Sequence, residues 1–228
     1  MSAPDPRIAL AARNNAEWCD AVTRSRGGTS RFEPELWINP GEAPPFYPNA
    51  VTLTPTPELQ AIAAAQGDFA VKDSFATLDL APLGFESLFE AMWIWRHAAP
   101  LQRDGPAAWR VMRDAASLAR WEAAWRGDEP ALDLFQPALL EAHEHTFMAG
   151  EVGGRIVAGC VASRSAEVVG ISNLFGPAER TAGCLAAVQD FAPGLPVVGY
   201  EAGAALEAMK SLGFQALGPL RVWLRKSG

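Results

Sequence analysis

The chain of 228 residues is long enough for one large domain or two small ones. Its formal net charge of −7 argues against nonspecific nucleic-acid binding, because such binding requires a basic surface. Its three cysteines are widely spaced and predict neither a disulfide framework nor a zinc site. The sequence contains no secretory signal and no apolar run of about 18 residues, so we expect a cytoplasmic protein without a membrane partner.

The first 106 residues are expected to form a separate α/β region. Five prolines from Pro40 to Pro55 exclude a helix there. The segment Phe85–Arg96 is ambiguous, and we interpret it as a strand because its end is rich in aromatic and β-branched residues. The other expected elements are a helix over Pro6–Arg24, a strand over Asn49–Thr54, a helix from Thr56 to Gly67 and a strand over Phe69–Leu80.

The polar segment Gln102–Pro106 is the best candidate for a linker, so residues 1–106 and 107–228 are predicted to be two domains. After it, Asp114 is placed to cap a helix whose apolar residues recur every three or four positions. The paired glycines Gly153 and Gly154 indicate a hairpin turn. The expected elements are strands over Trp109–Arg113, Thr146–Val152, Arg155–Ser163, Glu167–Phe175, Leu195–Tyr200 and Gln215–Leu224, and helices over Ala115–Trp125, Leu132–His145, Thr181–Phe191 and Ala202–Leu212.

This order of elements from Trp109 onward resembles the acyl-CoA-binding fold of the GNAT N-acetyltransferases. Three local features carry the resemblance: the paired strands AGEVGGRIVAGCVAS, the segment LFGPAERTAG, and the helix AALEAMKSLGF before the last strand. The resemblance implies an α/β fold with a mixed sheet in the C-terminal half. The N-terminal half is then either an α/β extension that adds strands to this sheet or a degenerate GNAT-like half.

The resemblance also implies a site for acetyl-CoA as cosubstrate. Anions bind at helix N-termini, and the family places the diphosphate on a loop with the pattern Arg/Gln-x-x-Gly-x-Gly/Ala. Arg180 and Gly183 match this pattern, whereas Leu185 stands where the family has a small residue. The implied cofactor residues are Arg180, Thr181, Ala182, Gly183, Cys184 and Leu185 for the diphosphate, and the backbone of Leu174, Phe175 and Gly176 for the pantetheine arm.

The acceptor implied by the resemblance is a small amine or a peptide amine. Many family members carry a tyrosine acid where this chain has Met209, so we assign proton transfer to Tyr200 and Glu201 instead. Asn173 is the candidate for positioning a polar acceptor. The alternative hypothesis is a catalytically inactive GNAT-like module that binds a metabolite or a protein partner. A third is a structural dimerisation domain, and a homodimer is possible under each hypothesis.

The pair His143 and His145 is the one sequence feature that suggests a metal. On the predicted helix these two side chains would point about 200° apart, and they would share a face only on a strand. No third ligand is close in sequence. We therefore predict no metal site.

Overall fold

The computed structural model describes residues 3–101 and 107–227, so the predicted linker Gln102–Pro106 lies outside the described residues. The chain forms two compact units. The first contains the N-terminal part up to Ile94, Tyr200–Lys210, and the C-terminal segment from Gln215. The second contains Trp95–Gly199 and Ser211–Phe214. None of the described helices has both the length and the apolar character needed to cross a bilayer.

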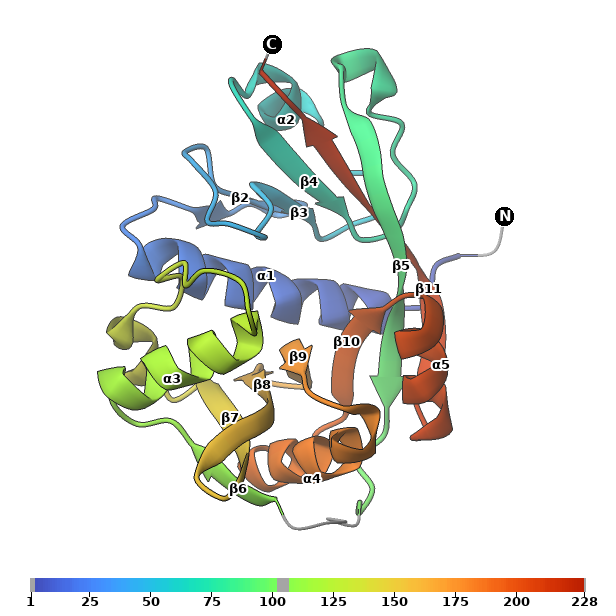
Figure 1. Ribbon diagram of the computed structural model, residues 1–228. Helices are drawn as coiled ribbons and strands as arrows, with labels where there is room; N and C mark the ends of the chain where they lie inside the picture. Colours follow the sequence, from blue (N-terminus) through green and yellow to red (C-terminus); the bar gives the residue numbers. More distant parts are fainter. Residues whose placement is uncertain (1–2, 102–106, 228) are drawn as a thin grey trace. The chain divides into compact units, whose positions relative to one another are not determined.

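The first unit is built around a sheet with the strand order β1-β2-β3-β4-β11-β5. Strand β11 pairs antiparallel with β4, and Figure 1 shows β4, β11 and β5 side by side. The elements of the first unit are α1 (Arg7–Ser25), β1 (Arg31–Phe32), β2 (Leu36–Ile38), β3 (Ala50–Thr52), α2 (Gln60–Ala64), β4 (Phe69–Asp73), the 3₁₀ turn η1 (Ala81–Leu83) and β11 (Gln215–Arg225), together with most of β5 (Glu86–Arg96) and most of α5 (Gly203–Ser211).

Alternation along β4 gives the sheet of the first unit two different faces. Phe69 and Val71 point to one side and pack with Trp223 of β11 and Ile62 of α2 in a buried apolar cluster. Ala70 and Lys72 must therefore point to the other side. The segment Phe85–Arg96, which the sequence left ambiguous, is confirmed as a strand.

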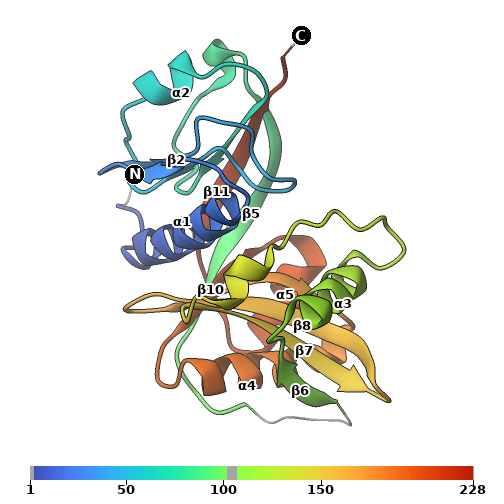
Figure 2. The same cartoon turned by 90° about the vertical axis from the view of Figure 1, so that its left-hand side faces the viewer.

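The second unit has the strand order β10-β9-β8-β7-β6, with β6 to β9 antiparallel and β10 parallel to β9. Helices α3 and α4 cover its two faces (Figure 2). Phe147 of β7 meets Trp121 of α3, while the next residue, Met148, lies with Ala187 of α4. The elements are β6 (Ala108–Val111), α3 (Ala115–Arg126), η2 (Pro137–Leu140), β7 (His145–Val152), β8 (Arg155–Arg164), β9 (Val169–Phe175), η3 (Ala178–Arg180), α4 (Thr181–Phe191) and β10 (Val197–Glu201).

The predicted helix over Leu132–His145 is wrong. This stretch contains only the 3₁₀ turn Pro137–Leu140, and His145 already belongs to β7. The buried carboxylate of Glu122 on α3 accepts the backbone N–H groups of Leu132, Leu134 and Phe135. Because these amides are satisfied by a side chain, the segment has no need of helical hydrogen bonds.

Candidate functional site

The parallel strands β9 and β10 are paired only near their starts among the described residues. Within the described residues, their register joins Val197 to Val169 and Val198 to Gly170, although β9 continues to Phe175. Beyond Gly170, β9 keeps its pairing with β8 on its other side. The later part of β9 therefore has backbone groups on its β10 side that the parallel ladder does not use.

A bulge lies in the same part of β9. Ser172 pairs with Val161 and Phe175 pairs with Gly159, so that Asn173 and Leu174 together stand opposite Cys160. Asn173 has a φ of +52°, a left-handed conformation that asparagine tolerates better than most residues. A bulge breaks the regular ladder and redirects the side chains around it. It falls on the residues predicted for the acceptor and for the pantetheine arm.

Gly176 fixes the end of β9 closely against β8. Its φ is +106°, and a Cβ built on it would lie 2.6 Å from the Cβ of Ala158 and 2.7 Å from the carbonyl oxygen of Val157. On the α3 face, the ring of Phe175 packs edge-on against Trp121, with centroids 5.2 Å apart. The backbone from Leu174 to Gly176 is thus held in place by neighbours within the second unit.

A single turn of 3₁₀ helix leads from β9 directly into α4. The N–H of Arg180 donates to the carbonyl of Pro177 at 2.9 Å, and the N–H of Thr181 donates to that of Ala178. Because α4 begins at Thr181, the N–H groups of Cys184 and Leu185 fall within the helix's own hydrogen-bond ladder. The N–H groups of Ala182 and Gly183 belong to the first turn, at the positive end of the helix dipole.

Three of the predicted cofactor residues have a packing role. A Cβ on Gly183 would lie 2.8 Å from Nε1 of Trp109, so this glycine allows β6 to place its indole against α4. Leu185 is fully buried. Cys184 is buried beside Cys160, and their hydrogen bond together with burial raises the pKa of Cys184 well above its usual value. Its thiol is therefore protonated and unsuited to act as a nucleophile.

Arg180 differs from these residues because its side chain is charged and is not fully buried. It is half-buried, and its guanidinium forms no hydrogen bond or ion pair with another described residue. A cation at the start of a helix is also repelled by the dipole, which favours negative charge there. Local stability therefore does not account for arginine at this position.

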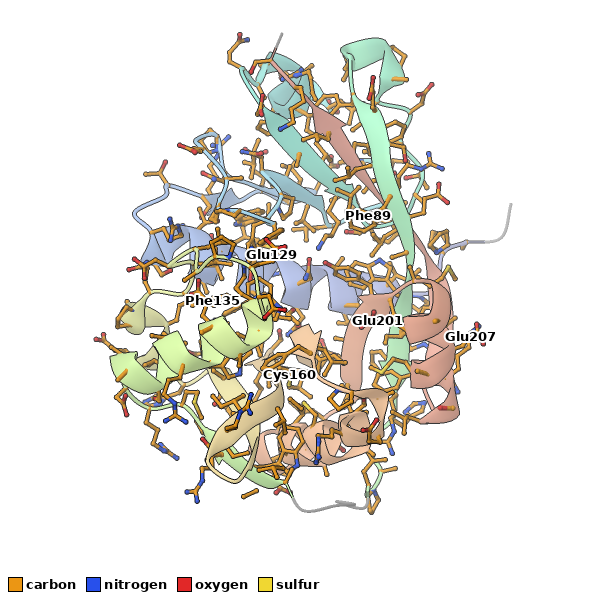
Figure 3. The ribbon with its side chains drawn as sticks, in the orientation of Figure 1. Phe89, Glu129, Phe135, Cys160, Glu201 and Glu207 are labelled. Carbon is orange, nitrogen blue, oxygen red and sulfur yellow. The ribbon has the colours of Figure 1, made fainter. Side chains whose placement is uncertain are left out.

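Tyr200 and Glu201 lie at the end of β10 and belong to the first unit (Glu201 is labelled in Figure 3). Burial raises the pKa of the Glu201 carboxyl. The Tyr200 hydroxyl accepts a hydrogen bond from Nζ of Lys72 at 3.2 Å, and its ring meets Trp93 edge-on. Sequence reasoning missed Lys72, although a lysine within the apolar strand FAVKD was a usable indication.

The structure divides the predicted site residues between the two units. Asn173, the Leu174–Gly176 backbone and the Arg180–Leu185 segment follow one another along β9, η3 and the start of α4 in the second unit. Tyr200 and Glu201 are placed in the first unit, as is Met209, which stands where the family has its tyrosine. Met209 is buried, and its thioether side chain has no proton to donate.

No family model matches the chain, and no curated protein matches it in sequence. Solved structures do resemble it. A GCN5-related N-acetyltransferase from Kribbella flavida has a TM-score of 0.65 at 14% identity over 96% of both chains. A putative GNAT-family acetyltransferase from Novosphingobium aromaticivorans has a TM-score of 0.58 at 17% identity, over 91% of this chain and 97% of that one. A GCN5-related N-acetyltransferase from Sphaerobacter thermophilus has a TM-score of 0.51 at 13% identity, over 99% of this chain and 95% of that one.

The chain therefore has the GNAT fold, and the resemblance predicted from the sequence is confirmed at that level. The likeness is not limited to the C-terminal half, because these structures cover almost all of the chain. It includes the first 106 residues, in which the sequence indicated no family.

Proposed function

We propose that the protein is an acetyl-CoA-dependent N-acetyltransferase that acts on a small amine or a peptide amine. The observation that carries the proposal is the uncompensated guanidinium of Arg180 at the start of α4, one 3₁₀ turn after a bulged strand that ends at Phe175. The GNAT fold supports it, because similar structures with N-acetyltransferase names share this arrangement of elements over nearly the whole chain.

In this proposal the diphosphate of acetyl-CoA binds at the start of α4. Arg180 supplies a cation, and Thr181, Ala182 and Gly183 supply the first turn of the helix with its positive dipole. Buried Cys184 and Leu185 anchor this turn to the sheet. The pantetheine arm lies along Leu174, Phe175 and Gly176, since its amides can hydrogen-bond to the backbone that the β9–β10 ladder leaves unused.

The reaction is a direct transfer. The acceptor amine attacks the thioester carbonyl, a new C–N bond forms as the C–S bond breaks, and coenzyme A leaves as its thiolate. Glu201 is the proposed base for the amine proton, because its raised pKa brings it nearer to neutral pH. Tyr200 is the proposed acid that returns a proton to the thiolate, and Asn173 the residue that positions the acceptor.

Titration calorimetry with coenzyme A and acetyl-CoA tests the binding step. We expect saturable binding, and we expect Arg180→Gln to weaken it by about tenfold, the usual contribution of one charge-assisted contact. Arg155→Gln is the matched control, because Arg155 is also in the second unit and is exposed at the start of β8. Absence of heat at millimolar ligand, or equal affinities for the two variants, would overturn the proposed site.

Catalysis is a separate step with a separate measurement. Methionine at position 209, which cannot donate a proton, and the large Leu185 favour the alternative, a catalytically inactive GNAT-like module that binds a metabolite or a protein partner. Release of free thiol from acetyl-CoA in the presence of a panel of primary amines distinguishes the two. Binding with amine-dependent thiol release supports the enzyme, and binding without any release across the panel supports the inactive module.

A further inference from the structure

A cavity of about 480 Å³ opens on the face of the first unit's sheet opposite the apolar cluster of Phe69, Val71 and Trp223. Its floor is formed by two cross-strand pairs, Ala70 with Leu224 and Lys72 with Val222, all on one face of β4 and β11. Its volume lies within the range of small-molecule clefts, about 300–1,000 Å³. Every residue that lines the cavity belongs to the first unit.

The rim of this cavity is unusually apolar for a surface. Phe46, Leu88 and Phe89 line it with exposures of 69%, 58% and 43%, and they are three of the four large apolar side chains that are exposed among the described residues. Figure 3 shows Phe89 on β5. Phe46 has a φ of +68°, a conformation that a bulky residue adopts only at a cost. Exposed apolar side chains gathered around a cavity are typical of a ligand site.

Lys72 is the one charged residue among the described residues that line the cavity, and it is only 4% exposed. Its Nζ donates to Oδ1 of Asn15 at 2.8 Å and to the hydroxyl of Tyr200 at 3.2 Å, and both acceptors are neutral. Nζ also lies 4.3 Å from the centre of the Tyr200 ring. No ion pair joins Lys72 to a carboxylate of the described residues. A buried ammonium without a counter-ion is costly, so the cavity contains a charge that a ligand could neutralise.

Two hydrogen-bond donors remain for such a ligand. An ammonium group has three protons, and two are directed to Asn15 and Tyr200. Because Tyr200 accepts from Lys72, its own hydroxyl proton is available to donate. One donor from each residue matches the two oxygens of a carboxylate, whereas a phosphate dianion calls for more donors and more positive charge.

We propose that this cavity binds a small molecule with an apolar body and a carboxylate group. Lys72 and Tyr200 hold the carboxylate, and the apolar body lies over Val222 and Leu224 beneath the exposed Phe89. This site is assigned from residues of the first unit alone, and its binding test does not depend on acetyl transfer. Because it uses the Tyr200 hydroxyl that is proposed above as the acid, a bound carboxylate would compete with that proton transfer.

Octanoate and octanamide are suitable probes, because they have the same chain and head-group shape, whereas the amide has no charge and has an NH2 donor in place of one acceptor oxygen. We expect calorimetry to show saturable octanoate binding, with octanamide weaker by about tenfold or more, as a hydrogen-bonded charge would give. In Lys72→Met, which keeps the aliphatic stem, the preference for octanoate should disappear. The control Lys210→Met removes an exposed lysine that pairs with Glu207, and it should leave both affinities unchanged.

A second variant keeps the test informative if Lys72→Met fails to fold. Val222→Trp retains the lysine but fills the cavity above the floor, so both probes should lose binding by about tenfold or more. Circular dichroism confirms that each variant is folded. The proposal is overturned if wild-type protein shows no saturable octanoate binding, if it binds both probes equally, or if folded Val222→Trp binds octanoate as well as the wild type.

Discussion

Replacing Gly176 by alanine tests whether the end of β9 is fixed by close packing. Two costs are expected. Alanine at the φ of +106° is strained by about 1–2 kcal/mol, the typical cost of a left-handed conformation for an L-residue. The new methyl group would also lie 2.6 Å from the Cβ of Ala158 and 2.7 Å from its Cα, both rigid parts of β8. Overpacking of this kind costs about 1–3 kcal/mol.

The free energy of unfolding should therefore fall by about 2–5 kcal/mol in Gly176→Ala. Gly194→Ala is the matched control in the same unit, because Gly194 has a φ of +80° but no atom within 4 Å of the site of its Cβ. The free energy of unfolding of the control should fall only by the cost of the backbone strain, about 1–2 kcal/mol. Replacing glycine by alanine also stabilises a protein by lowering the conformational entropy of its unfolded chain. This gain is common to both variants, so it cancels when their stabilities are compared.

Urea denaturation followed by tryptophan fluorescence gives both free energies. The informative quantity is the difference between the two variants, which the close approach to β8 sets at about 1–3 kcal/mol. If the two variants lose the same stability, then β9 does not lie against β8 as described, and the fixed Leu174–Gly176 backbone of the proposed site is refuted. A Gly176→Ala variant that folds should also bind coenzyme A more weakly than Gly194→Ala.

Two further changes test the core and the buried carboxyl. Trp121→Ala should lower the free energy of unfolding by about 3–5 kcal/mol in urea denaturation, because Trp121 is fully buried among Phe135, Phe147 and Phe175 and donates to the carbonyl of Met148. The control Trp125→Ala should lower it clearly less, because Trp125 is partly exposed. Equal losses in the two variants would contradict the packing. Burial raises the pKa of Glu201 above its unfolded value, so the folded state holds the extra proton between the two pKa values and wild-type stability falls as the pH rises through that window. Glu201→Gln should remove this fall, so the urea midpoint of the variant should rise relative to that of the wild type between acidic and neutral pH. A difference between the two midpoints that does not change with pH would show that the pKa of the Glu201 carboxyl is not raised.

The parts of the fold that sequence reasoning predicted are those with a local chemical cause. Asp114 accepts the N–H of Ser117 in a capping box, and α3 starts directly after Asp114, the residue predicted to cap it. Gly153 and Gly154 both have positive φ, as a two-residue hairpin turn between β7 and β8 requires. In each case the residues that determine the structure are neighbours in the chain.

The parts that were missed depend on residues distant in sequence. The segment after α3 has helical composition, but the buried Glu122 accepts hydrogen bonds from three of its backbone amides, and the segment is irregular up to the 3₁₀ turn η2. The sequence predicted a strand over Gln215–Leu224 without showing that β11 lies between β4 and β5. The buried position of Lys72 follows from that placement, because Val222 of β11 pairs with it. Sequence periodicity specifies which side a residue faces, and it does not specify the strand next to it.

The same distinction decides which residue the cofactor proposal depends on. Gly183 fits the family pattern, but Trp109 lies so close to it that packing alone requires a glycine, and its loss would disturb the fold with or without a ligand. Arg180 has no such reason, since it has no partner among the described residues and its charge opposes the dipole of α4. A bound diphosphate would reverse that penalty by placing two negative charges between the guanidinium and the helix. Arg180→Gln should therefore leave the unliganded protein at least as stable as the wild type and weaken its binding of coenzyme A, a combination that a purely structural arginine would not produce.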